Sequence, residues 1–227
     1  MAAGQKRKSS NSCGNLPETL KIAPRMQADF SVELTNDDPT LALPWHDPEN
    51  RWQYHDLRSH PEQVACIQEV KEFPELRDFL FAVNSPSSNL QSAKCDAWYS
   101  DEMTEEDAVF GATCKFGAYV DVVFHHRAPQ MSFPLHEAFA VRLVELIKRA
   151  PEIPASMEII IRRAHFEDAP DQVRQGFYFT VYVYGYGEDE AQAKQSCGIA
   201  LRLIGHAALQ MSTGRGISAH TMEPEQS

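Results

Sequence analysis

The sequence predicts an α+β protein: an antiparallel sheet of about five strands with two helices packed on one face, preceded by a segment of loops and short helices. Between residues 91 and 211 the hydrophobic pattern runs strand, strand, helix, strand, strand, helix. The strand patterns are long and rich in aromatic and β-branched residues, and helices segregated on one face of such a sheet are typical of this class. The order fits a ferredoxin-like βαββα core over residues 115–211 with an extra edge hairpin, or a duplicated ββα unit.

Length and composition are those of a globular protein with a substantial core. The 227 residues are 43% hydrophobic and 23% charged, which suits one domain of moderate size with appendages. The formal net charge of −11 argues against general binding to nucleic acid, because an acidic body repels phosphate. No apolar run approaches the roughly 18 residues that cross a bilayer, and no secretory signal is evident. We therefore expect no membrane association and a cytoplasmic location.

Four regions follow from the patterning. Residues 1–27 carry a Lys-Arg-Lys run without hydrophobic periodicity and are expected to be a disordered basic tail. Residues 28–90 combine a strand, loops and short helices into a covering segment. Residues 91–211 form the α+β core domain, and the polar residues 212–227 are expected to be a second disordered tail.

The covering segment contains three kinds of pattern. Residues 28–35, "ADFSVELT", alternate apolar and polar side chains and predict a short strand. Several prolines between residues 36 and 60 predict loop. "PEQVACIQEVKEFPELRDFLFAV" predicts two short helices that break before Pro74, since proline lacks the amide hydrogen that a helix interior uses.

The first half of the core predicts two strands and a helix. Residues 92–100, "SAKCDAWYS", alternate as a strand does. After an acidic turn, "AVFGATCKFGAYVDVVFHH" predicts one long bent strand or two, with Gly111 and Gly117 as bulge or kink positions. Residues 132–150 have helical periodicity, with Ser132 able to cap the start.

The second half of the core again predicts two strands followed by a helix. "SMEIIIRRAHF" and "GFYFTVYVYGYG" predict two strands joined by a long connection. Residues 188–211 predict a helix with three acidic residues in its first turn, where the helix dipole favours anions.

One face of the predicted sheet carries many aromatic side chains. If the helices cover the apolar face, the period-2 geometry of strands leaves these residues on the other: Lys94, Asp96, Trp98, Lys115, Tyr119, Asp121, His125, Tyr178, Thr180, Tyr182 and Tyr184. So large an aromatic patch is unfavourable in water. It could be covered by residues 28–90, form a dimer interface or bind a ligand. Tyrosine suits interfaces, so Tyr178, Tyr182 and Tyr184 are the candidate interface residues.

The stretch "WHDPENRWQYHDLRSH", residues 45–60, concentrates three histidines and two aspartates. Metal ligands on a helix need spacings of three or four, and ligands in a loop need a turn that gathers them. His46 and His55 meet neither condition, so no metal and no cofactor are predicted. The favoured interpretation is that Trp45, Trp52 and Tyr54 clamp an irregular segment onto the core while its polar residues satisfy the backbone.

Cysteine and motif content exclude several function classes. The five cysteines are an odd set without C-x-x-C spacing, which argues against a disulfide framework or a zinc knuckle. Phosphate-binding loops, dinucleotide fingerprints and the common hydrolase and zinc-protease motifs are absent from the sequence.

Two functions remain. The leading prediction is a non-catalytic cytoplasmic protein that acts through self-association, as a homodimer, or through a protein partner, using the aromatic sheet face. The alternative is a small-molecule-binding protein or enzyme with its site between the 45–60 loop and the open sheet face. The candidate ligand-binding residues of that site are Trp45, His46, His55, Trp98, Asp121, His125 and Tyr182.

Overall fold

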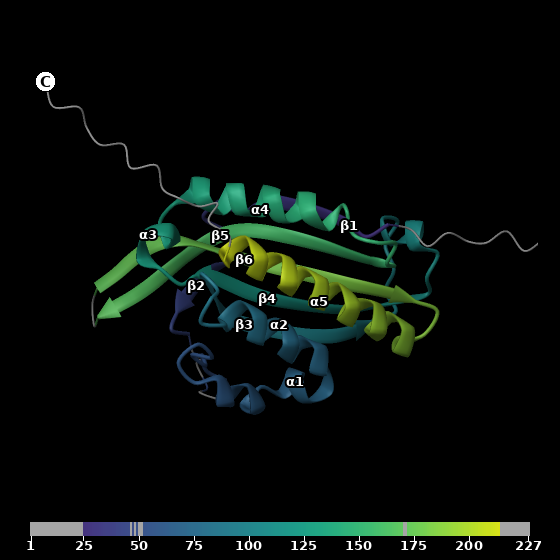
Figure 1. Ribbon diagram of the computed structural model, residues 1–227, viewed down its shortest axis with the longest axis horizontal. Helices are drawn as coiled ribbons and strands as arrows, with labels where there is room; N and C mark the ends of the chain where they lie inside the picture. The colour runs from purple at the N-terminus through teal and green to yellow at the C-terminus, as the bar shows by residue number, and fades with distance from the viewer. Residues whose placement is uncertain (1–24, 46, 48, 50–51, 170–171, 214–227) are drawn as a thin grey trace, which may run out of the picture.

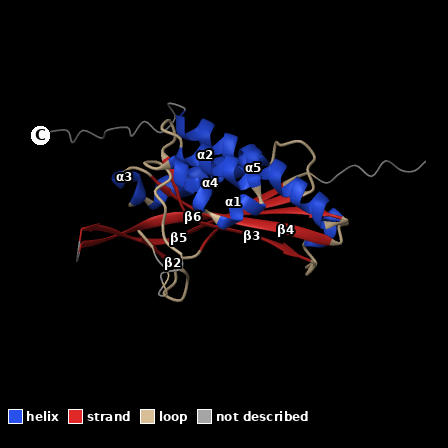
Figure 2. Ribbon diagram, turned by 90° about the horizontal axis from the view of Figure 1, so that it is seen from below, coloured by secondary structure: helices blue, strands red, loops and turns tan. Residues whose placement is uncertain are grey.

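The computed structural model describes residues 25–213 except 46, 48, 50–51 and 170–171. Within these residues the chain forms a mixed sheet with helices gathered on one of its faces (Figures 1 and 2). The strands are β1 (Gln27–Val32), β2 (Thr40–Leu43), β3 (Leu90–Ser100), β4 (Cys114–Phe124), β5 (Ala155–Ala169) and β6 (Gln172–Gly187). The α-helices are α1 (Gln68–Glu72), α2 (Pro74–Asn84), α3 (Arg127–Gln130), α4 (Phe133–Ile147) and α5 (Glu190–Thr213), and the 3₁₀ helices are η1 (Pro61–Cys66) and η2 (Asp107–Phe110).

The strands of the sheet lie in the order β1-β5-β6-β4-β3, and β2 also pairs with β5. β1 runs parallel to residues 156–161 of β5, and β2 runs parallel to residues 163–166. The remaining pairs are antiparallel. The α+β class is therefore confirmed, but the sheet differs from the expected antiparallel one. It has six strands rather than about five, and both strands before residue 45 join it in the parallel sense.

The helix layer covers the apolar face of the sheet. Inward-facing residues of β4, β5 and β6 form one core with the apolar sides of α2, α4 and α5. α2 therefore joins the two helices that were expected on this face, because Leu76, Phe79 and Leu80 are fully buried. α5 comes so close to β6 that a Cβ atom at Gly185 would lie 2.1 Å from the amide nitrogen of Cys197. Only glycine permits that approach.

Segment 28–90 contributes to three parts of the molecule. Its strands extend the sheet beside β5, and α2 lies in the helix layer. Between them, the chain passes below the sheet, on the side opposite the helices (Figure 2). On that side of the sheet, Leu41 of β2 is buried with Ala93, Val123 and Tyr178, residues of β3, β4 and β6, and Leu43 and Trp45 pack against this group. We call residues 41–45 the crossing segment. The segment thus covers one end of the open face.

No helix in the described part of the chain is both long and apolar enough to span a membrane.

Candidate functional site

The crossing segment is tied to the far edge of the sheet by Trp45. Its indole Nε1 donates a hydrogen bond of 2.6 Å to the carbonyl oxygen of Ala93 on β3. Beyond Trp45 the chain turns back on itself: the amide of Tyr54 donates to the Trp45 carbonyl at 2.9 Å, and the amide of Asp47 donates to the Trp52 carbonyl at 3.0 Å. The described residues between 45 and 57 therefore form a wall beside the edge strand.

The end of this wall is held by a polar cluster centred on Gln91. The Gln91 side-chain amide donates to the hydroxyl of Tyr54 and, at 3.3 Å, to the carboxylate of Asp56. Its carbonyl oxygen lies 3.2 Å from Nδ1 of His125. Burial and the nearby Asp56 carboxylate raise the pKa of Tyr54 to about 12. The phenol thus stays protonated at neutral pH and acts as a structural hydrogen-bonding group.

Arg58 anchors the next residues to the loop after α2. One guanidinium nitrogen donates to the carbonyl oxygens of Ser85 and Ser88 at 3.0 and 2.8 Å, and another donates to that of Pro86 at 3.1 Å. These carbonyl groups belong to the loop after α2, where backbone acceptors have no helix or strand partners, so Arg58 satisfies groups that would otherwise need water. The stretch from Trp45 to Arg58 is consequently fastened at both ends.

A cavity of about 530 Å³ lies between this wall, the residues that lead into α2, and the edge of β3. Its lining combines aromatic, aliphatic and charged side chains: Trp45, Asp47, Trp52, Gln53, His55, Leu57, Cys66, Ile67, Gln68, Glu69, Leu80, Ser92, Ala93, Lys94, Cys95, Asp96 and Tyr119. A mixed lining of this kind, with a few polar groups among apolar ones, is usual for small-molecule sites.

Five consecutive residues of β3, Ser92 to Asp96, line the cavity. Successive side chains of a strand point to opposite faces, so an unbroken run can line one cavity only if the cavity lies along the strand's edge. β3 is the last strand on that side of the described sheet. The cavity therefore offers the backbone of an edge strand as well as side chains.

Charges around the cavity are mostly negative. Asp47, Glu69 and Asp96 contribute carboxylates and Lys94 an ammonium group, which lies 5.6 Å from the centre of the Trp45 ring. Burial raises the pKa of the Cys95 thiol to about 12, and the negative charges of Glu69, Asp96 and Asp121 add to the effect. The thiol is thus protonated at neutral pH and is a poor nucleophile.

Four aromatic side chains, Trp98, Tyr119, Tyr182 and Tyr184, lie next to the cavity on the open face, and we call them the aromatic quartet. Tyr119 belongs to both features. The ring centres are 6.3 Å apart for Trp98 and Tyr119, 5.6 Å for Tyr119 and Tyr182, and 5.9 Å for Trp98 and Tyr184. All four are half-buried. They make room for one another over Gly117, where a Cβ atom would lie 2.8 Å from the Trp98 ring.

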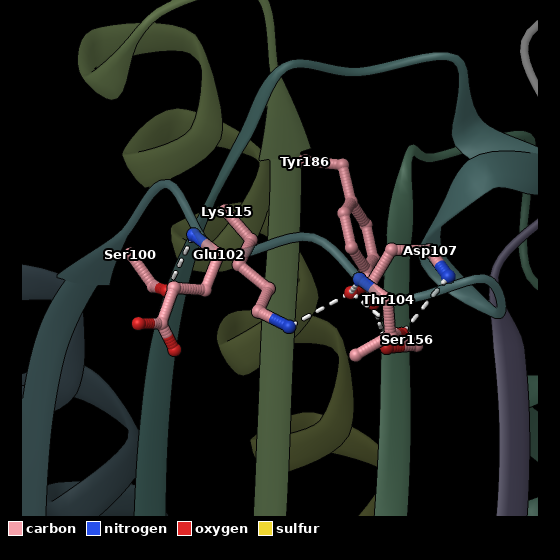
Figure 3. A network of polar contacts seen from close by, with 7 residues as sticks. All are labelled: Ser100, Glu102, Thr104, Asp107, Lys115, Ser156 and Tyr186. Atoms are coloured by element: carbon pink, nitrogen blue, oxygen red, sulfur yellow. Dashed lines mark hydrogen bonds and ion pairs between the residues drawn. The ribbon is translucent and has the colours of Figure 1, made fainter.

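The loop between β3 and β4 closes the other end of the open face through Asp107 (Figure 3). One carboxylate oxygen accepts a hydrogen bond from the hydroxyl of Tyr186 at 2.7 Å, and the Tyr186 hydroxyl lies 3.0 Å from that of Ser156. The other oxygen accepts from the amide and hydroxyl of Thr104 and, at 2.8 Å, from Nζ of Lys115. Burial alone would raise the pKa of Asp107, but these hydrogen bonds outweigh it and lower the pKa to about 2. The residue is a structural anchor.

Asp121 occupies the middle of the open face and is 6% exposed. The Thr180 hydroxyl donates to it at 2.7 Å, and Arg162 donates to Thr180 at 2.9 Å. Arg162 also donates to Glu33 at 2.7 Å. Burial raises the pKa of Asp121 to about 6, although the Thr180 hydrogen bond and the charges of Lys94 and Arg162 act in the opposite direction.

The structure divides the predicted ligand residues between these features. Trp45 and His55 line the cavity, and His55 is also within 3.2 Å of the Gln63 side chain. Trp98 and Tyr182 belong to the aromatic quartet and do not line the cavity. Asp121 lies two residues from Tyr119 along β4, where it pairs with Thr180 and accepts that residue's hydrogen bond.

The two remaining predicted ligand residues, His125 and His46, are not among the described residues that line the cavity. His125 belongs to the Gln91 cluster rather than to the cavity, and His46 lies outside the described residues. The three predicted interface tyrosines also differ in how much of each side chain is exposed. Tyr178 is 3% exposed because the crossing segment covers it, whereas Tyr182 and Tyr184 remain half-buried in the quartet.

Several lining residues were not predicted. Glu69 and Leu80 belong to α1 and α2, and Ile67 lies between η1 and α1; nothing in their local pattern marks them as lining residues. Lys94 and Asp96 were expected on the open face, but not at a cavity. No group of three or more histidine, cysteine or acidic side chains in the described part of the chain is arranged to hold a metal ion.

Comparison of the chain with protein-family models, with curated protein sequences and with solved structures found no significant match.

Proposed function

We propose that the protein binds a small organic molecule in the cavity between the edge of β3 and the wall formed by the described residues between 45 and 57. The observation that carries this proposal is the cavity itself, whose volume of about 530 Å³ falls within the range of roughly 300–1,000 Å³ typical of ligand sites. Its wall is fixed by the hydrogen bonds of Trp45 and Arg58. A site that exists before its ligand arrives loses less conformational entropy on binding.

A cavity-filling variant tests this proposal. Cys66 is exposed and lines the cavity, so Cys66→Trp should obstruct it without disturbing the core. The matched control is Ala65→Trp, since Ala65 is exposed and does not line the cavity. A fragment library would be screened by NMR chemical-shift changes of the full chain. We expect fragments that shift the resonances of residues 92–96, bind Ala65→Trp equally and fail to bind Cys66→Trp. Fragments that bind both variants equally, or no binding at millimolar concentration, would refute the site.

The aromatic quartet supports a second candidate function, self-association. Its four rings remain half-buried between the crossing segment and the loop anchored by Asp107. A stable dimer needs roughly 800 Å² of buried surface per partner, so the quartet would form the centre of a larger contact. Sedimentation equilibrium should show a wild-type dimer and a folded monomer for Tyr182→Glu combined with Tyr184→Glu. The control is Ile199→Glu on the outer side of α5, which is 38% exposed. A wild-type monomer at high concentration would exclude this function.

We also infer that β4, α4, β5, β6 and α5 form a ferredoxin-like βαββα core. This is supported by the position of β6 between β4 and β5, with antiparallel pairing on both sides and both helices on one face. β3 then adds to the β4 edge. The same elements also divide into two ββα halves, β3-β4-α4 and β5-β6-α5. Cross-strand amide contacts in NMR spectra that require a different strand order would refute the inference.

A further inference from the structure

We propose that the cavity selects an organic cation with an aromatic or aliphatic body. The inference rests on the proposed function and names the class of ligand for that site. It follows from three properties of the described lining: its excess of carboxylates, its aromatic rings, and the position of Lys94 among them.

Among the described residues that line the cavity, carboxylate side chains outnumber cationic ones: Asp47, Glu69 and Asp96 against Lys94. In the described part of the chain, neither Glu69 nor Asp96 forms a salt bridge. The whole chain has a formal net charge of −11, which adds a long-range attraction for cations and a repulsion for anions.

The aromatic residues supply the second half of the recognition. Trp45, Trp52 and Tyr119 line the same space as the carboxylates. The face of an aromatic ring carries partial negative charge and attracts ammonium groups, with tryptophan the strongest of the three aromatic types. Such a wall also packs against the apolar body of a ligand. Carboxylates together with tryptophan faces therefore favour an amine or a quaternary ammonium compound over a neutral or anionic molecule of the same size.

Lys94 shows that this environment already holds a cation. Its ammonium group lies 5.6 Å from the centre of the Trp45 ring, and its residue pairs across the strands with Asp121, whose carboxyl lies on the same face. The lysine side chain is exposed and long enough to swing away. A ligand cation would take its place over Trp45, so Lys94 acts as a competitor rather than as a ligand-binding group.

This role of Lys94 gives the test two variants with opposite expected effects. The probes are tryptamine, which is a cation at neutral pH, tryptophol, which is neutral, and indole-3-propionate, which is an anion. Their affinities for the full chain would be measured by calorimetry. We expect tryptamine to bind most tightly and indole-3-propionate most weakly. Glu69→Gln combined with Asp96→Asn should weaken tryptamine about tenfold, equivalent to about 1.4 kcal/mol, and leave tryptophol within about twofold. Lys94→Met should strengthen tryptamine binding.

Glu137→Gln is the control for overall charge, because Glu137 is exposed on α4 and does not line the cavity. It should leave all three affinities within about twofold of wild type. Binding of tryptophol as tight as that of tryptamine, or of an anion that Lys94→Met abolishes, would overturn the cation inference while leaving the cavity a ligand site. If none of the three probes bound although library fragments did, the cation inference would also fail alone. Failure of both the probes and the library would refute the proposed function.

Discussion

Trp45 and Ala93 are 48 positions apart in the sequence, yet the indole nitrogen of one lies 2.6 Å from the carbonyl oxygen of the other. Trp45 belongs to the segment that crosses the open face, and Ala93 belongs to the edge strand β3. The hydrogen bond therefore determines where the cavity wall stands relative to the strand. The Ala93 carbonyl would otherwise be an unsatisfied acceptor at the edge of the sheet, a position that favours unwanted strand pairing.

The first prediction concerns the effect of removing this hydrogen bond on the stability of the protein. Trp45→Phe keeps an aromatic ring but removes the donor, so we expect the free energy of unfolding to fall by about 1 kcal/mol, the usual net contribution of such a bond. Residues 52–57 should also become more susceptible to limited proteolysis. Urea unfolding and a chymotrypsin time course, which reports cleavage after aromatic residues such as Tyr54, would measure the two effects. Trp52→Phe is the control, since Trp52 is 53% exposed. Equal effects of the two substitutions would contradict the tether.

The features that the sequence predicted are those with local periodicity. Alternation in β6 placed Tyr182 and Tyr184 on one face, and the structure pairs them with Tyr119 and Gly117 of β4. The long helices were predicted within a few residues of their ends, because an amphipathic stripe over several turns is a strong local signal. The aromatic quartet was therefore predictable as a set, although its degree of exposure was not.

The cavity was not predictable from the same signals. It depends on contacts between segments distant in sequence, such as Glu69, Leu80 and Asp96, and no periodicity connects them. β2 was missed for a related reason. It is four residues long, lies among prolines, and owes its strand conformation to parallel pairing with β5. Gly117 was expected to mark a bulge or kink, but the pairing of β4 stays in register there, and the missing side chain instead leaves space for the quartet.

The packing over Gly117 gives a second prediction. In Gly117→Ala the new methyl group would lie 2.8 Å from the Trp98 ring and 3.0 Å from the Tyr184 ring. The rings must move, and we expect a loss of about 1–3 kcal/mol in the free energy of unfolding together with a changed near-ultraviolet circular dichroism spectrum. Gly205→Ala on α5 is the control: its nearest neighbour would be 3.3 Å away, and alanine is the better helix former. A Gly117→Ala protein with wild-type stability and spectrum would show that the quartet is not closely packed.

A third prediction concerns the pH dependence of stability at Asp107. Its hydrogen bonds lower the folded-state pKa to about 2, below the ordinary value of 3.8. The ionised carboxylate therefore contributes stability that is fully present above about pH 4 and is lost as the pH falls towards 2. The shift corresponds to about 2 kcal/mol. Asp107→Asn should be less stable than wild type at pH 7, and urea unfolding should show this difference shrinking below pH 4. A difference that stays constant down to pH 2.5 would exclude the ionised carboxylate as its source.

Asp121 should show the opposite pH dependence. Burial raises the pKa of Asp121 in the folded protein to about 6, above the ordinary value of 3.8. Between about pH 4 and pH 6, the folded protein therefore keeps the proton on this carboxyl group, whereas the unfolded chain releases it. The contribution to stability is thus fully present below about pH 4 and is lost as the pH rises through 6. Asp121→Asn is permanently neutral, and its side-chain oxygen can still accept the hydrogen bond from Thr180. We therefore expect the variant to exceed wild type in free energy of unfolding at pH 7, by up to about 3 kcal/mol.

Urea unfolding from pH 3 to 8 would measure this difference, which should disappear below pH 4. Asp96→Asn removes an exposed carboxylate from the same face, and it should change the free energy of unfolding by no more than about 0.5 kcal/mol. An Asp121→Asn protein less stable than wild type at pH 7 would mean that the ionised carboxylate, through Thr180 and Arg162, stabilises the open face. In that case the charge of Asp121, rather than its burial, would be the dominant influence at the centre of the sheet.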